Sequence, residues 1–72
     1  RALDVHQREE AFIVRYDALF RWACRLTNDP VEAEDLLQEC YVAFVCTNTN
    51  TVIENLDGYL RRMLSNLQRS NA

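Results

Sequence analysis

The chain has 72 residues, a formal net charge of −3 and a hydrophobic fraction of 49%. This length allows one domain with one modest core, and the hydrophobic fraction is too high for an intrinsically disordered segment. Glycine and proline occur once each, which disfavours a turn-rich β fold and favours a few helices joined by short loops. We therefore expect residues 1–72 to form a single all-α domain, a small bundle of three to four helices.

The ends of the sequence and its apolar runs indicate the class of protein. No apolar run approaches the roughly 20 residues that a membrane span requires, and no signal-peptide pattern is present. The chain also does not begin with methionine. We interpret it as a fragment of a longer cytoplasmic protein that has no membrane partner.

The first predicted helix runs without interruption from about Asp4 or His6 to Leu26, because apolar residues recur there at helical spacing. Four arginines and one acid are expected mostly on its opposite, solvated side: Arg8, Arg15, Asp17, Arg21 and Arg25. The expected buried face comprises Phe12, Tyr16, Leu19, Ala23 and Leu26, and it is widened by Ile13, Phe20 and Trp22.

The second predicted helix runs from about Pro30 to Val45. Proline suits the first position of a helix, Asp29 can cap the free amides, and Glu32 stands where a capping-box acid would lie. One face is expected to be buried and contains Ala33, Leu37, Cys40, Tyr41 and Phe44. The opposite face is expected to project Asp35, Gln38, Glu39 and Val42.

This second helix is unusually acidic. Five acids fall between Asp29 and Glu39, and no basic residue lies between Thr27 and Arg61. Acids in a first turn are favoured by the helix dipole, but Glu39 lies beyond that turn. Because such a charge density is unnecessary for folding and adds self-repulsion, it indicates a surface for a basic partner. A helix face that is merely solvated is the alternative.

The polar run from Thr47 to Thr51 is predicted to be a loop, after which Val52 and Ile53 dock on the core. Asn55 or Asp57 can cap a third long helix that extends to about Gln68. Its apolar stripe contains Leu56, Leu60, Met63 and Leu67, and a neighbouring stripe contains Tyr59, Arg62, Asn66 and Arg69. The second stripe could stack on bases, contact phosphates and bond a base edge, or it could be a solvated face.

Charge is divided unevenly along the chain. Residues 1–56 carry five arginines against ten acids, whereas residues 57–72 carry three arginines against one acid. A basic last helix on an acidic body indicates two different partner surfaces.

The sequence lacks the usual signs of catalysis. His6 is the only imidazole, and neither a local nucleophile motif nor a glycine-rich phosphate loop is present. The three cysteines, Cys24, Cys40 and Cys46, are an odd number without the spacing of a zinc site. We therefore predict a protein that is not an enzyme and binds no cofactor or metal, and whose cysteines serve packing rather than disulfides.

Three motifs resemble one family. The segments Tyr16 to Phe20 and Ala23 to Asp29 resemble the opening helix of region 2 of bacterial sigma factors, in the extracytoplasmic-function group of the sigma-70 family. The segment from Ala33 to Tyr41 is similar to the family signature A-E-D-L-V-Q-E-x-F, and Gly58 to Asn66 resembles its W-L-x-R-I-A-x-N motif. The resemblance covers about residues 10–70.

This resemblance implies a domain that binds the β′ clamp helices of RNA polymerase and recognises and melts the promoter −10 element on its single-stranded non-template strand. An anti-sigma factor is a candidate further partner. By position, the resemblance assigns the polymerase contact to Asp35, Leu36, Gln38 and Glu39. It assigns the DNA contact to Tyr59, Arg62, Asn66 and Arg69 on the last helix, and to Thr47, Asn48, Thr49 and Asn50 in the loop.

Other interpretations remain open at the level of sequence. The chain contains no lysine, which favours a diverged helical interaction module that keeps the acidic face but does not read DNA. A second alternative is a structural fragment with a solvated acidic helix, and a third is a small metal-binding or redox domain that uses the cysteines.

Overall fold

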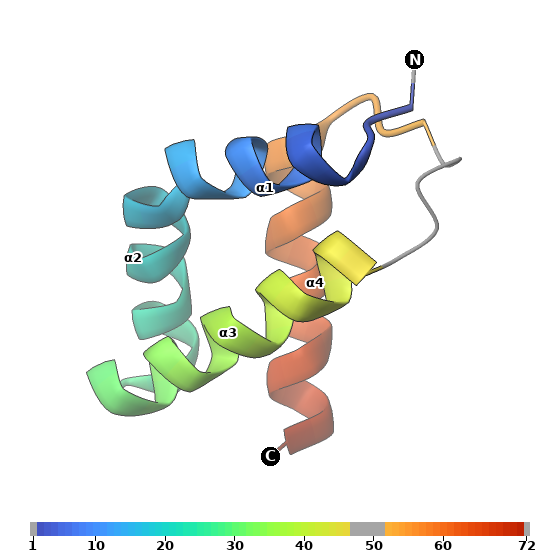
Figure 1. Cartoon of the computed structure of the whole chain (residues 1–72). Coiled ribbons are helices and arrows are strands. Elements are labelled where there is room, and N and C mark those ends of the chain that lie inside the picture. The colour runs from blue at the N-terminus through green and yellow to red at the C-terminus, as the bar shows by residue number, and fades with distance from the viewer. Residues whose placement is uncertain (1, 47–51, 72) are drawn as a thin grey trace.

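The computed structural model describes residues 2–46 and 52–71, and in these ranges the chain is entirely helical apart from its connections. The four helices are α1 (Val5–Val14), α2 (Tyr16–Thr27), α3 (Pro30–Cys46) and α4 (Leu56–Asn71). This arrangement confirms the predicted all-α fold class. Helix α3 contacts each of the other three helices, and α2 also contacts α4 (Figure 1).

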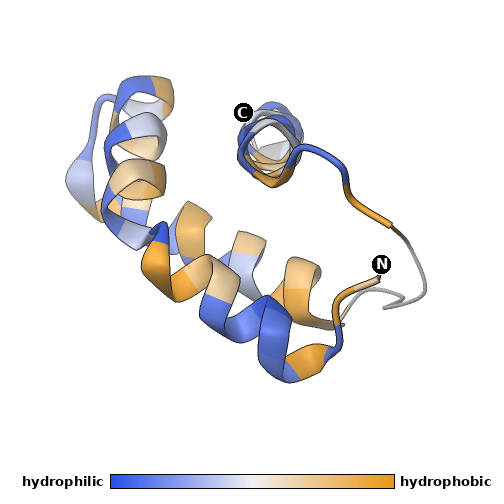
Figure 2. Cartoon of the chain, turned by 90° about the horizontal axis from the view of Figure 1, so that it is seen from above, coloured by the Kyte–Doolittle hydropathy of each residue, from blue (hydrophilic) through white to orange (hydrophobic). Residues whose placement is uncertain are grey.

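Seen from above, α4 is viewed end-on and lies on the concave side of the other helices (Figure 2). Within the described part of the chain, no helix has the length and apolarity needed to cross a membrane.

The core lies where α3 meets its neighbours. Its fully buried side chains include Leu37 and Phe44 from α3, and Leu60 from α4. The α3 prediction is confirmed, because Ala33, Leu37, Cys40 and Phe44 are buried and Tyr41 is half-buried. The α4 stripe also includes Leu64, which is fully buried and was absent from the predicted stripe.

The prediction of one long first helix is wrong, since the chain breaks at Arg15. This residue has φ −102° and ψ 4°, and its N–H donates to the carbonyl of Phe12 at 3.1 Å rather than continuing the α-helical pattern. The Ala11 carbonyl, which an unbroken helix would have paired with that N–H, accepts instead from the Arg15 guanidinium at 2.9 Å. Arg15 Nε also meets the Asp57 carboxylate at 2.7 Å, so the break is tied to the start of α4.

The break changes which side chains are buried on the first two helices. Phe12, Leu19 and Ala23 are buried as predicted, but Ile13 is 63% exposed and Tyr16 is 41% exposed. With Arg15 outside a regular helix, α1 and α2 no longer share one continuous apolar face. The two exposed side chains are therefore available on the surface near α3.

Arg8 also contradicts its predicted place on the solvated side, because it is fully buried. Its Nη1 donates to the Phe44 carbonyl at 2.9 Å, and its guanidinium carbon lies 4.8 Å from the centre of the Phe44 ring. The Phe44 carbonyl belongs to the last turn of α3, where carbonyls lack a helical partner and the helix dipole favours a cation. Arg8 therefore attaches α1 to the carboxyl end of α3.

The connections between helices follow their local sequence. Asn28 adopts the left-handed conformation (φ 57°) and closes α2 by donating its N–H to the Cys24 carbonyl. Asp29 caps α3 as predicted, since its carboxylate accepts from the N–H of Val31 at 2.9 Å. Asn55, one of the two predicted caps, begins α4 by accepting from the N–H of Gly58 at 3.1 Å.

The cysteines differ in their exposure, and none forms a disulfide within the described ranges. Cys40 is buried, and burial raises the pKa of its thiol to about 12. We expect a disulfide-exchange reagent to modify the exposed Cys46 rapidly in the native protein and to modify Cys40 only after unfolding. Counting modified thiols by mass with and without denaturant tests this, and fast native modification of Cys40 would contradict its burial.

Candidate functional site

The predicted polymerase-facing side chains lie along one side of α3. Asp35, Gln38 and Glu39 are exposed, as expected. The side chains of Asp35 and Gln38 make no hydrogen bond or ion pair to any other described residue, so both are available to a partner. Leu36 differs from the other three, because it is only 4% exposed and belongs to the core beneath this face. We call Asp35, Gln38 and Glu39 the acidic face.

An apolar groove borders the acidic face and was not predicted. It is formed where α1 and the start of α2 pass over α3, and Gln38 lies in both the groove and the acidic face. Val42, 58% exposed, is a further apolar side chain on its rim. The signal missed in the sequence is the break at Arg15. The groove is lined by Phe12, Ile13, Tyr16, Leu37, Gln38, Tyr41 and Val42.

A polar hydroxyl lies at one side of this apolar groove. Tyr41 donates from its hydroxyl to Glu9 at 3.1 Å, and its ring packs edge-on against Phe12. Burial, together with the nearby Glu9 carboxylate, raises the pKa of Tyr41 above its ordinary value. The groove thus joins an apolar floor to a charged margin, the combination typical of protein interfaces.

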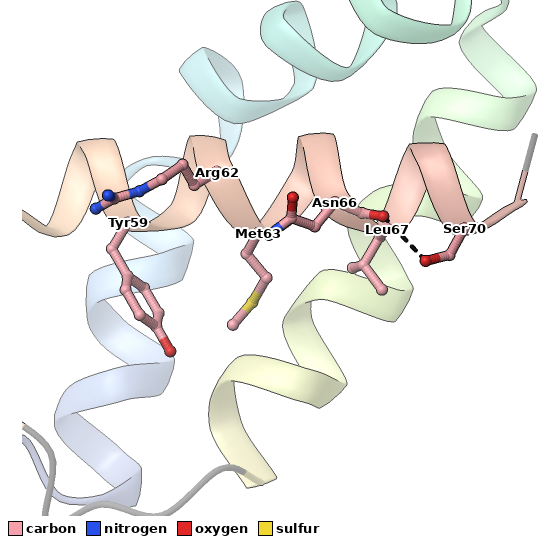
Figure 3. A pocket seen from close by; sticks show the side chains of 6 residues that line it. All are labelled: Tyr59, Arg62, Met63, Asn66, Leu67 and Ser70. Carbon is pink, nitrogen blue, oxygen red and sulfur yellow. Dashed lines mark hydrogen bonds between the residues drawn. The ribbon is translucent and has the colours of Figure 1, made fainter.

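Four of the eight predicted DNA-contact residues lie on α4, and three of these four line one groove. Figure 3 shows Tyr59, Arg62 and Asn66 on this helix together with the apolar side chains of Met63 and Leu67. We call it the α4 groove. Ser70 also lines the groove and donates its hydroxyl to the backbone carbonyl of Asn66 at 3.1 Å. The side-chain amide of Asn66 takes no part in this bond. Arg69 is exposed on the same helix but does not line the groove.

Tyr59 is less exposed than expected for a side chain of the predicted DNA-contact stripe on α4. Its ring is half-buried and lies 6.1 Å from the Phe44 ring, so part of it belongs to the core. Tyr59 and Arg62 also line an adjoining groove formed by the chain before α4, which contains Val52 and Ile53. Ile53 packs on the core as predicted, whereas Val52 is 57% exposed. The segment that leads into α4 thus borders the α4 groove.

Comparison with known proteins now identifies the family. Residues 12–70 match the family described as Sigma-70 region 2. The chain belongs to the Sigma-70 region 2 family. It is also 42% identical over 64 residues to the RNA polymerase sigma-E factor of Streptomyces avermitilis, in agreement with an extracytoplasmic-function type of region 2.

That alignment covers 88% of this chain but only 36% of the Streptomyces avermitilis protein, so this region 2 domain spans about a third of that relative. No solved structure matches the chain significantly.

Four predicted contact residues of this region 2 domain, Thr47, Asn48, Thr49 and Asn50, lie outside the described residues. In the parts that are described, no group of three or more histidine, cysteine or acidic side chains could hold a metal ion. The acidic face and the α4 groove are therefore the two candidate sites that the sequence predicted and that can be located.

A further surface of the region 2 domain, like the apolar groove, was not predicted. Arg21 and Arg25 of α2 meet Arg61 of α4 around the half-buried Trp22. Arg21, Trp22 and Arg25 lie at positions i, i+1 and i+4 of α2, and this spacing places them on one helix face. The sequence alone could therefore have indicated that these three side chains lie together. Their encounter with Arg61 depends on how α2 packs against α4, and helical periodicity cannot supply that information.

Proposed function

We propose that this domain acts in transcription initiation as the part of a sigma factor that binds RNA polymerase and reads the promoter −10 element. The observation that carries the proposal is the position of the family's acid and amide pattern. Asp35 and Gln38 are exposed on α3, and within the described residues neither is paired. Side chains that are not used for folding are available to a basic partner.

The proposed polymerase contact is the acidic face against the clamp helices of the β′ subunit. Opposite charges would guide the encounter, and the neighbouring apolar groove would add buried area. Leu36 supports this contact from within the core and would not reach the partner unless α3 shifts. The contact should therefore weaken with salt but keep an apolar contribution that salt does not remove.

The proposed DNA contact is the α4 groove with the preceding segment, residues 47–53. In the groove, Tyr59 offers an aromatic surface, Arg62 a guanidinium and Asn66 an amide for a base edge. Extruding a base costs a few kcal/mol, which a domain this small cannot easily supply alone. We infer that polymerase binding comes first and contributes the missing affinity.

Two amide substitutions test both contacts in one design. Gln38→Ala should weaken binding to a β′ clamp-helix fragment roughly tenfold, the cost of a hydrogen bond to a charged group, and leave DNA binding unchanged. Asn66→Ala should do the reverse, with weaker binding and altered base preference on a single-stranded −10 oligonucleotide and normal clamp-helix binding. Calorimetry and fluorescence anisotropy on the two variants give these four values.

Each variant serves as the other's control, since both remove one exposed amide from a helix. If Gln38→Ala binds the clamp helices as tightly as the unmodified domain, the acidic face is not the polymerase contact. If the unmodified domain binds the clamp helices but no oligonucleotide, the alternative function holds, an interaction module that does not read DNA. Arg62 is the single basic residue lining the described part of the α4 groove, which is the observation that favours this alternative.

A further inference from the structure

A pocket between α2 and α4 gathers three of the chain's eight arginines. Arg21 and Arg25 come from α2 and Arg61 from α4, and Ala18 and Trp22 complete the lining. We call it the arginine pocket. The Arg61 guanidinium lies over the Trp22 ring, with its carbon 5.3 Å from the ring centre. Arg25 and Arg61 lie within segments that resemble the family, but no residue of the pocket is among the predicted polymerase or DNA contacts.

No acidic side chain lines the arginine pocket. None of its three guanidinium groups forms a salt bridge with a carboxylate among the described residues, although the chain carries a net charge of −3. Like charges gathered around one pocket repel each other, and folding does not require them. Because a bound anion would remove this repulsion, the arrangement indicates an anionic ligand.

The position of Arg61 favours a nucleic-acid phosphate over other anions. Arg61 and Arg62 are neighbours on α4, and successive helical residues point roughly 100° apart. Arg61 lines the arginine pocket while Arg62 lines the α4 groove, so positive charge continues around the helix from one site to the other. Guanidinium forks suit phosphate oxygens, and a backbone carries phosphates at regular intervals.

We propose that the arginine pocket binds the phosphodiester backbone of promoter DNA, on a face of α4 next to the one with which the α4 groove would read the bases. This inference rests on the proposed DNA-binding function and extends it to a second, sequence-independent contact. It also adds three arginines to Arg62, the single basic residue that lines the described part of the α4 groove. Phosphate contacts of this kind fix the position of DNA without selecting its sequence.

Trp22 makes the proposal directly measurable, because it is the only tryptophan in the chain and lies in the arginine pocket. The probe is a DNA duplex of mixed sequence with a single-stranded extension, titrated at low salt. Trp22 fluorescence reports the pocket, and anisotropy of a label on the DNA reports total binding. We expect both signals to change together, since a phosphate would draw Arg61 from the indole ring.

Variants locate the signal. Log affinity falls as log salt concentration rises, and Arg25→Gln and Arg61→Gln should each make this fall less steep by about one. Each should also reduce the Trp22 fluorescence response, whatever the DNA sequence. Arg61→Lys keeps the charge and should keep most of the slope. Arg62→Gln is the matched neighbour, which should weaken binding but leave the Trp22 response at saturation intact.

Three results would overturn the proposal. If anisotropy shows binding while Trp22 is silent and the pocket variants keep the full slope, the arginine pocket is not a contact and the proposed function stands. If polyglutamate of equal charge changes Trp22 fluorescence at lower concentration than DNA, the ligand is an acidic peptide. If no DNA binds at low salt even when the clamp-helix fragment is bound, both the pocket and the DNA-reading part of the proposed function are wrong, whereas clamp-helix binding still tests the polymerase part.

Discussion

Asp35→Arg is expected to abolish measurable binding to the β′ clamp helices and leave the domain folded. The substitution replaces an exposed carboxylate on the acidic face with a cation. Like charges placed opposite each other across an interface cost several kcal/mol, so affinity should fall more than about a hundredfold. The Asp35 side chain makes no hydrogen bond or ion pair with another described residue, and a surface change of this kind alters stability by only about 0.5 kcal/mol.

The measurement is a calorimetric titration of the clamp-helix fragment, with circular dichroism to establish helical content. Glu10→Arg is the matched control, because it makes the same change of charge at an exposed position on α1. An equal loss in both variants would mean that net charge, and not the acidic face, governs binding. Unchanged affinity in Asp35→Arg would remove the main support for the proposed polymerase contact.

Arg8→Ala is expected to produce the largest loss of stability among the substitutions considered. It empties a fully buried side-chain volume and leaves the Phe44 carbonyl without its 2.9 Å donor. Large-to-small changes in a core cost about 2–5 kcal/mol, and a buried carbonyl that loses its partner costs about 1–3 kcal/mol. In a domain of 72 residues, where total stability is small, the variant should be largely unfolded at room temperature.

Arg8→Met separates the two contributions to this loss. Methionine fills most of the volume but cannot donate a hydrogen bond, so the loss should be confined to about 1–3 kcal/mol. Urea unfolding followed by circular dichroism gives both values. Equal stability of Arg8→Met and the unmodified domain would show that the bond to Phe44 contributes nothing beyond packing.

The sequence predicts most of the helical structure, for reasons visible in particular residues. Asp29 and Pro30 start α3, Asn55 starts α4, and the apolar spacing of α3 identifies its buried face. These features depend on neighbours a few positions away, which a sequence displays directly. The exposed positions of Asp35 and Gln38 follow from the same periodicity.

The errors concern residues whose environment is set by distant parts of the chain. Arg15 interrupts the first predicted helix and is held by Asp57, 42 positions away. Two β-branched residues, Ile13 and Val14, precede the break and are a weak local sign of it. Arg8 lies four positions before Phe12 and so shares its buried face, but only the packing of α1 against α3 provides an acceptor for its charge.

The two anchors on either side of residues 47–51 have a consequence for how such a domain can diversify. Arg8 holds the last turn of α3, while the packing of Ile53 and the Asn55 cap hold the start of α4. The helical frame is therefore specified by contacts outside the connecting segment. Doubling the length of a connection costs only about 0.6 kcal/mol in loop-closure entropy. Residues 47–51 can therefore be replaced by segments of another length or sequence at little cost in stability. Evolution or design can alter the connection while the frame that presents it is conserved.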